Sequence, residues 1–182
     1  MISVVVPIYN GEKFIEKLYM SLSKQTYQDF EMIFVNDGSK DNSLEILNIF
    51  ANKDKRVRVV SQPNAGICSA RNKGIEYSQG EYLVFLDQDD GFENDLLENY
   101  YNSITKNTCD LAVFGKIHYY IENGKCLRKQ NRSFDFEVVT EKNKIYEYMF
   151  NVDNKNRIST IWNCIYKREI ILNNNIKFDT YF

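Results

Sequence analysis

Short apolar runs alternate with stretches of helical spacing over the first half of the chain. Four runs have the length and the β-branched content of strands covered on both faces: residues 2–6, 31–35, 57–60 and 82–86. Between them, apolar residues recur every three or four positions, in residues 14–22, 44–50 and 67–77. Alternation of this kind predicts an α/β fold with a mainly parallel central sheet.

The pattern is looser after residue 105. It predicts a longer strand, a hairpin turn, a second strand, a helix, a third strand and a short helix, in that order, at residues 111–121, 122–126, 134–139, 141–150, 158–166 and 168–174. A chain of 182 residues is long enough for one well-buried domain. We therefore expect a single core.

Polar segments follow each of the four strands predicted in the first half. They read PIYN at residues 7–10, NDGS at 36–39, QPNAG at 62–66 and DQDD at 87–90. In open α/β sheets, ligands bind beyond the carboxyl ends of the strands. The binding site is therefore expected where these four segments meet.

Composition and charge argue against several classes of protein. Hydrophobic residues make up 43% of the chain and charged residues 26%, which is typical of a globular rather than a disordered protein. The net charge of −2 argues against nucleic-acid binding through bulk electrostatics. No apolar stretch approaches the roughly 20 residues that cross a bilayer. Pro7 interrupts the first apolar run too early for a signal peptide.

The cysteines and the single histidine do not indicate a zinc site. Cys68, Cys109, Cys126 and Cys164 lie far apart without a CxxC pair, which favours reduced thiols in a cytoplasmic protein. His118 lies in an apolar and aromatic run, so a structural role is favoured over a catalytic one.

Four basic residues gather near the predicted hairpin turn: Lys125, Arg128, Lys129 and Arg132. A solvated hairpin is the favoured interpretation of this cluster. Contact with an anionic acceptor or with a membrane surface is the alternative.

The segment DQDD places three carboxylates directly after an apolar run. One interpretation is a turn, because Asp is a frequent turn residue. The other is a cation site, because Asp87 and Asp89 are two positions apart and can point the same way. Together they can hold Mn²⁺ or Mg²⁺, and the ion can bridge a diphosphate. An EF-hand loop is excluded by register, since glycine falls fifth rather than sixth counted from Asp87.

Other phosphate-binding motifs are absent from the sequence. Neither a GxGxxG fingerprint nor a P-loop is present. A phosphate-bearing ligand therefore needs another counter-charge, which a cation at Asp87 and Asp89 supplies.

Four collinear motifs resemble those of family 2 glycosyltransferases of the GT-A fold. They are VVVPIYN at the start, VNDGSKDNS after the second strand, NAGICSARNKGIEYSQGEYLVFLDQDD across the middle and TIWNCIYKREIILNNNIKF near the end. The resemblance covers nearly the whole chain. It implies a Rossmann-like three-layer sandwich with a donor-binding half at residues 1–105. Residues 106–182 would be a partial acceptor-side region of the same domain, truncated there.

The resemblance implies roles for single residues. Asp87 and Asp89 match the family's DxD pair, with Asp89 as the direct ligand of Mn²⁺ or Mg²⁺. Pro7 and Tyr9 match positions that line the pocket of the nucleobase, and Asp37 matches one that accepts a hydrogen bond from the uracil imide. Asn64, Arg71 and Asp87 match positions around the nucleotide. The Arg71 fork suits a phosphate or a base edge because it is always charged.

Each of these residues also has a plainer interpretation. Asp37 and Asn64 are common turn formers, Arg71 could be a surface helix residue, and Tyr9 could be a core aromatic. Their joint occurrence at predicted strand ends favours the functional interpretation, most strongly for Asp37 and the two DxD carboxylates.

The resemblance implies an inverting transfer of sugar from a nucleotide sugar, with UDP-sugar as the expected donor. The acceptor would be a hydroxyl on a saccharide, a lipid-linked glycan or a protein, in the synthesis of surface polysaccharide, glycolipid or glycoprotein. A cytoplasmic location is expected, with peripheral contact to the inner face of the membrane as an option. The charge argument assigns the metal to the leaving diphosphate and a carboxylate base to the acceptor hydroxyl.

Two departures from the family pattern affect the acceptor side. The base motif is expected beyond Phe182, so the catalytic base is not assigned, and Asp179 is a poor candidate for it. The family often has a basic residue where Cys164 stands. We therefore expect the chain to bind nucleotide sugar and to transfer it weakly or not at all.

Two alternatives compete with this interpretation. One is a nucleotide-sugar binding module without catalysis. The other is a Rossmann-type oxidoreductase, which shares the α/β pattern but requires the glycine fingerprint that is absent here.

Overall fold

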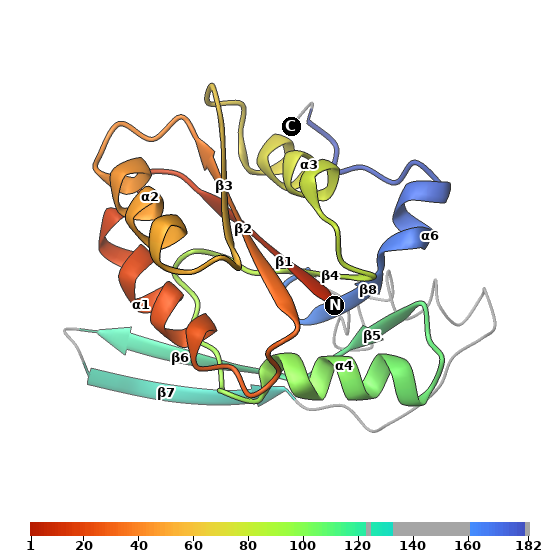
Figure 1. The fold of residues 1–182 in the computed structure, drawn as a ribbon. Coiled ribbons are helices and arrows are strands. Elements are labelled where there is room, and N and C mark those ends of the chain that lie inside the picture. Colours follow the sequence, from red (N-terminus) through yellow and green to blue (C-terminus); the bar gives the residue numbers. More distant parts are fainter. Residues whose placement is uncertain (123–124, 133–160, 181–182) are drawn as a thin grey trace.

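Six strands form one sheet with helices on both faces in the computed structural model, which describes residues 1–122, 125–132 and 161–180 (Figure 1). The strands are β1 (Ile2–Ile8), β2 (Phe30–Asp37), β3 (Val57–Gln62), β4 (Tyr82–Phe85), β5 (Leu111–Val113), β6 (Lys116–Glu122), β7 (Lys125–Arg132) and β8 (Cys164–Lys167). The helices are α1 (Glu12–Ser23), α2 (Ser43–Lys53), α3 (Ile67–Tyr77), α4 (Leu96–Lys106) and α6 (Arg168–Asn173).

The sheet is mainly parallel, in the order β3-β2-β1-β4-β8-β5. The four strands from the first half of the chain pair in parallel, with Ile2 beside Phe30 of β2 and beside Tyr82 of β4. Strand β8 runs antiparallel to both of its neighbours. This arrangement confirms the predicted α/β class and the mainly parallel sheet. It also brings the carboxyl ends of β1, β2 and β4 to one edge.

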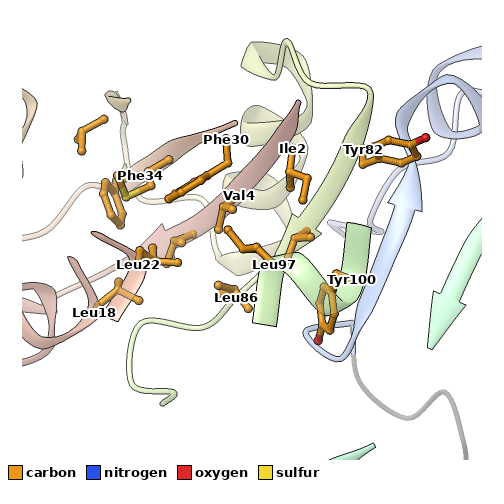
Figure 2. Packing of buried hydrophobic residues seen from close by; sticks show 14 of the residues in the cluster. Ile2, Val4, Leu18, Leu22, Phe30, Phe34, Tyr82, Leu86, Leu97 and Tyr100 are labelled. Atoms are coloured by element: carbon orange, nitrogen blue, oxygen red, sulfur yellow. The ribbon is translucent and has the colours of Figure 1, made fainter. Parts of the chain in front are cut away.

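Neighbouring residues of a strand point to opposite faces of the sheet. Helices cover both faces, so the side chains on each are buried. One face packs against α1, α2 and α4, and its cluster includes Val4, Leu22 and Leu97 (Figure 2). The other face packs against α3 and α6 through Val5 and Ala70 among others. Burial on both faces explains why these strands read as continuous apolar runs. The three-layer arrangement follows from it.

Three sequence predictions for the second half differ from the structure. The helix α4 was not predicted, although its apolar residues have helical spacing. The strand predicted at 111–121 is wrong, because β5 ends at Val113 and β6 belongs to a separate two-stranded sheet. Between them, Phe114 N–H bonds to Asn163 C=O at 2.8 Å, which turns the chain toward β8. The strand predicted at 158–166 begins only at Cys164 within the described residues.

Other predictions for this half agree with the structure or fall outside its described part. The hairpin turn between β6 and β7 and the short helix α6 lie where they were predicted. The strand β7 itself, at Lys125–Arg132, was not predicted. The four basic residues of the hairpin region are on β7, and His118 is on β6. The predicted strand at 134–139 and helix at 141–150 lie outside the described residues. Among the residues described, no helix has the length and apolar character needed to cross a bilayer.

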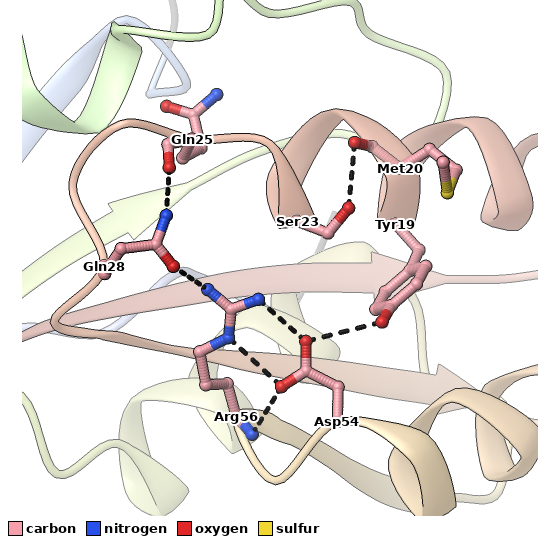
Figure 3. Close-up of polar contacts among 7 residues, drawn as sticks. All are labelled: Tyr19, Met20, Ser23, Gln25, Gln28, Asp54 and Arg56. Carbon is pink, nitrogen blue, oxygen red and sulfur yellow. Dashed lines mark hydrogen bonds and ion pairs between the residues drawn. The ribbon is translucent and has the colours of Figure 1, made fainter.

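A polar network fixes the turn between α2 and β3 at the amino end of the strands (Figure 3). The Arg56 guanidinium donates two hydrogen bonds to Asp54, at 3.1 and 2.8 Å, and a third to Gln28 Oε1 at 2.8 Å. Tyr19 OH also donates to Asp54. The bonds from Arg56 hold the pKa of Asp54 below its usual range. This network is at the end of the sheet opposite to the cavity described below.

Candidate functional site

A cavity of about 340 Å³ opens at the carboxyl ends of β1, β2 and β4. Its walls contain six of the seven site residues predicted from the sequence: Pro7, Tyr9, Asp37, Asn64, Asp87 and Asp89. The remaining lining residues are Ile8, Gly66, Ile67 and Gln88. Segments that are far apart in sequence thus meet at the position expected for a ligand in an α/β sheet.

Asp37 ends β2 and organises the loop between β3 and α3. Its side chain is buried, and its carboxylate accepts hydrogen bonds from Gln62 Nε2 at 2.7 Å and from the backbone N–H groups of Ala65 and Gly66, each at 2.9 Å. A carboxylate offers about four acceptor positions. One acceptor position on Asp37 therefore remains for a donor in the cavity. The turn-former interpretation also holds here, because the same side chain builds the loop.

Gly38 is required by the close approach of this loop. It has φ of +68°, a conformation that L side chains rarely adopt. A Cβ at this position would lie 2.6 Å from the Asn64 backbone nitrogen. Asn64 in turn donates from Nδ2 to the Asp37 carbonyl at 3.0 Å. The NDG sequence thus brings the second and third strand ends together beside the cavity.

Tyr9 presents an aromatic side chain at the mouth of the cavity. It is 43% exposed, so it is not the core aromatic that the plainer interpretation suggested. The loop that carries it is tied to the loop after β2, since Asn10 N–H donates to Ser39 Oγ at 3.1 Å and Lys40 N–H donates to Asn10 Oδ1 at 2.9 Å. Pro7 is buried within β1 and forms the floor beside it. An exposed ring on a fixed loop is a suitable platform for stacking.

The carboxylates of DQDD lie in a turn at the end of β4. Asp90 N–H donates to the Asp87 carbonyl at 3.3 Å, so the turn interpretation is also correct. Asp90 Oδ2 is buried and has no hydrogen-bond partner in the described part of the chain. Burial, together with repulsion from Asp87 and Asp89, raises the pKa of Asp90 to about 6. The three carboxylates therefore create a concentration of negative charge that is not neutralised within the turn.

Arg71 approaches this charge from α3, although it does not line the cavity. Its Nη2 donates to Asp87 Oδ1 at 2.9 Å, and the guanidinium lies over the Phe178 ring at 5.5 Å from the ring centre. Its side chain is only 13% exposed. Arg71 is therefore a largely covered partner of Asp87 and not the surface helix residue of the plainer interpretation. One oxygen of Asp87 remains outside this ion pair.

The segment after α6 is fastened to α3 next to Arg71. Asn72 donates from Nδ2 to the Phe178 carbonyl and accepts from the Phe178 N–H, both at 2.9 Å. The Phe178 ring also packs edge-on against Phe85 of β4, with centres 5.3 Å apart. These contacts hold the ring that supports Arg71.

The side chains of the cavity include possible ligands for a divalent metal ion. Within the described residues, no group of three or more His, Cys, Asp or Glu side chains is arranged to hold an ion. Asp87 and Asp89, two of the carboxylates that line the cavity, are available to a ligand, since Asp89 is exposed and Asp87 keeps one oxygen outside the ion pair with Arg71. Mg²⁺ commonly binds through one or two carboxylates together with substrate phosphates. The pair therefore fits a divalent ion that completes its coordination with a diphosphate.

Sequence reasoning did not select Gln88, Gly66 or Ile67, which also line the cavity. The alternation of an extended segment would place Gln88 on the side opposite to Asp87 and Asp89. In the structure this segment is a turn, and all three residues line the cavity. Cys164 is fully buried on β8, so a cation at that position would have no access to solvent. Cys68 and Cys109 are free thiols.

The sequence of the chain is similar to those of known glycosyltransferases. A model of the family described as "Glycosyl transferase family 2" matches residues 3–173. The uncharacterized glycosyltransferase EpsJ of Bacillus subtilis is 33% identical over 179 residues, which are 98% of this chain and 51% of EpsJ. The cholesterol galactosyltransferase of Borreliella burgdorferi is 33% identical over 97% of this chain and 50% of its own length. The chain thus spans about half the length of these relatives.

Solved structures share the fold. S. aureus TarS in complex with UDP-GlcNAc superposes with a TM-score of 0.75 at 28% identity, over 98% of this chain and 48% of the TarS chain. A mannosyltransferase from Pyrobaculum calidifontis in complex with GDP-Man and Mn²⁺ superposes with a TM-score of 0.67 at 19% identity, over 99% of this chain and 48% of that chain.

Proposed function

Because the chain belongs to glycosyl transferase family 2, we propose that it binds a nucleotide sugar, first of all a UDP-sugar, and donates the sugar to an acceptor hydroxyl. The observation that carries the proposal is the single cavity that gathers Tyr9, Asp37, Asp87 and Asp89 at the strand ends. It combines an aromatic platform, a base acceptor and a carboxylate pair. These three features correspond to the base and the diphosphate of one ligand.

The nucleoside would occupy the side of the cavity near β1 and β2. There Tyr9 offers a face for stacking, and the remaining acceptor position of Asp37 suits the N–H of a uracil imide. Support for uracil comes from TarS, which is 28% identical and was solved with UDP-GlcNAc. A guanine base also carries N–H donors, so GDP belongs among the ligands to be tested.

The diphosphate would lie beside Asp87 and Asp89, with a divalent ion between phosphate and carboxylate. Mn²⁺ or Mg²⁺ would supply Lewis-acid stabilisation of the negative charge that grows on the leaving diphosphate. Arg71 holds Asp87 in place through the 2.9 Å ion pair. The ionised carboxylate of Asp90, whose buried Oδ2 has no partner among the described residues, would add to the negative charge that attracts a cation.

The reaction proposed is a transfer with inversion at the anomeric carbon. The oxygen of an acceptor hydroxyl forms the new bond, the bond to the diphosphate oxygen breaks, and the hydroxyl proton passes to a base. We assign no base to this chain, whose donor side is the part described above. The acceptor, be it a saccharide, a lipid-linked glycan or a protein, is left to experiment, as are the cytoplasmic location and any contact with the inner membrane face.

The class of ligand can be tested by thermal shift of the chain with UDP, GDP, ADP and NAD, each with MnCl₂ and with EDTA. A ligand at 100 times its dissociation constant stabilises a protein by about 2.7 kcal/mol, or about 5 to 10 °C for a domain of this size. We expect such a shift for UDP with Mn²⁺ and a much smaller one with EDTA. A shift for NAD that is independent of metal would contradict the proposal and favour an oxidoreductase.

A further inference from the structure

The cavity exists because β1 and β4 separate at their carboxyl ends. The last backbone hydrogen bond that joins them in the described residues runs from Leu86 N–H to Val5 C=O at 3.1 Å. Beyond it, Pro7 has no N–H to donate. The backbone segments of Tyr9 and Asp87 therefore diverge, and the space between them becomes part of the cavity.

The side chain of Gln88 spans this gap. Its Oε1 accepts from the Tyr9 N–H at 3.1 Å, and its Nε2 donates to the Tyr9 C=O at 3.3 Å. Both backbone groups of one residue are thus satisfied by one side-chain amide. Gln88 stands between Asp87 and Asp89 in sequence, so the bridge connects the carboxylate turn directly to the loop that presents the Tyr9 ring.

Gly11 makes room for the bridging amide. A Cβ on Gly11 would lie 2.5 Å from Gln88 Oε1, which is closer than real Cβ contacts allow. The backbone φ of Gly11 is −103°, which any residue can adopt. The close approach to Gln88 is therefore the constraint that favours glycine here, together with a 3.2 Å contact to Ile8.

We propose that Gln88 is a positioning residue that couples the nucleoside end of the cavity to its metal end, through its paired hydrogen bonds to Tyr9. This inference rests on the proposed function and deepens it. A cation held by Asp87 and Asp89 would fix the turn that carries the Gln88 amide, and the two hydrogen bonds of that amide would in turn fix the Tyr9 loop. The coupling is reciprocal, so a nucleoside stacked on Tyr9 also favours the metal-bound turn.

A neutral amide is the group required for this task. It donates and accepts at once, which a carboxylate cannot do at neutral pH. A Glu at this position would also add a fourth negative charge to the turn. Methionine has a similar length and volume but forms neither hydrogen bond, so Gln88→Met isolates the bridge from packing.

Uridine is the probe that separates this coupling from direct contact, because it has no phosphate to touch the metal. We would titrate the full chain with uridine by NMR, with and without Mg²⁺, which leaves the spectra undisturbed. In the unmodified chain, uridine affinity should rise about fivefold with Mg²⁺, at the low end of the usual range for coupled sites. In Gln88→Met, the ratio should fall to near one. UDP binding serves as the positive control.

The matched control is Gln79→Met. Gln79 is an exposed glutamine just before the amino end of β4, whereas Gln88 lies just after the carboxyl end of the same strand. This variant should keep the full ratio. Gly11→Ala should also lower the ratio, because its Cβ would displace the Gln88 amide. This variant takes the place of Gln88→Met if the latter fails to fold.

A readout without ligand accompanies the titration. The Tyr9 amide proton is held by Gln88 Oε1. Its hydrogen exchange should therefore be severalfold faster in Gln88→Met than in the unmodified chain or in Gln79→Met.

The outcomes distinguish the inference from the function beneath it. If UDP binds but uridine affinity does not depend on Mg²⁺, or depends on it equally in Gln88→Met, the coupling role is refuted and the donor site stands. If neither UDP nor uridine binds, the proposed function is refuted, and the coupling role falls with it.

Discussion

Buried carboxylates in this chain are held by hydrogen bonds from neighbouring strands and loops. Asp37 receives three such bonds and thereby fixes the loop that closes the cavity. Glu31, near the amino end of β2, accepts from Ser3 Oγ at 2.6 Å, from Arg58 Nη1 at 2.9 Å and from the Gln79 N–H at 2.7 Å. Asp37 thus builds the site, whereas Glu31 ties β1, β3 and the segment before β4 to β2.

The ionisation of Glu31 makes stability depend on pH. Burial acts to raise its pKa, but the hydrogen bonds from Ser3, Arg58 and Gln79 prevail and hold the pKa below its usual range. A carboxyl whose pKa is lower in the folded state contributes stability above its unfolded pKa of about 4.3, and this stability is lost as pH falls through the folded pKa. Glu31→Gln should therefore lower the free energy of unfolding at pH 7 and have a smaller effect near pH 3.

Urea unfolding of the unmodified chain and of Glu31→Gln, across that pH range, measures this difference. Glu16→Gln is the control, because Glu16 is exposed on α1. This substitution should change the free energy of unfolding very little at any pH. An effect of Glu31→Gln that is the same at pH 7 and pH 3 would contradict the assignment.

Close packing of α3 on β1 supports the site at the level of elements. Gly74 faces Val5 so closely that a Cβ would lie 2.1 Å from Val5 Cγ1. Both residues are buried, and the same helix carries Arg71, which contacts Asp87 of the DQDD turn. Any movement of α3 away from β1 would therefore also displace the partner of Asp87.

Gly74→Ala should destabilise the chain by about 1–3 kcal/mol through overpacking. This cost opposes the roughly 1 kcal/mol that alanine gains over glycine inside a helix. Chemical denaturation measures the change, and Gly91→Ala is the control because a Cβ on Gly91 meets nothing within 4 Å. Equal stability of the two variants would show that the helix is not held against β1 at this point.

An element can be predicted from the sequence when its pattern of apolar residues lies within the element itself. The strands β1 to β4 are covered on both faces, so their apolar runs are visible without any partner. The position of β8 between β4 and β5 depends on pairings between segments far apart in sequence, such as Val84 with Ile165 and Ala112 with Ile165, which no local pattern reports. Helix α4 did carry a local signal in Leu97, Tyr100 and Ile104, and was overlooked after the carboxylate turn.

The same distinction applies to the site. Asp87 and Asp89 were predicted from their spacing after an apolar run, and Asp37 from the family resemblance together with its place at a strand end; all three line the cavity. The hydrogen bonds between Gln88 and Tyr9 join residues 79 positions apart, and the contact of Arg71 with Phe178 spans more than 100 positions. Contacts of this kind depend on how the strand ends and the segment after α6 come together, so they emerged only from the structure.

Over the whole molecule, polar and charged groups are divided between the two ends of the sheet. The amino end contains the paired network of Asp54 and Arg56, in which each charge has a partner (Figure 3). The carboxyl end contains Asp87, Asp89 and Asp90 with one largely covered arginine among them. An excess of negative charge at a cavity is costly to a folded protein unless a cation offsets it. We therefore propose that a metal and a diphosphate bind at that end.

The most direct test of this central claim is calorimetric titration of UDP into the chain with Mn²⁺, compared with Asp89→Asn and with Asp95→Asn. Asp95 is an exposed carboxylate at the start of α4 and serves as the matched control. We expect metal-dependent binding of one UDP per chain that is lost in Asp89→Asn and kept in Asp95→Asn. Binding of UDP that is unchanged by Asp89→Asn, or by removal of Mn²⁺, would contradict the account.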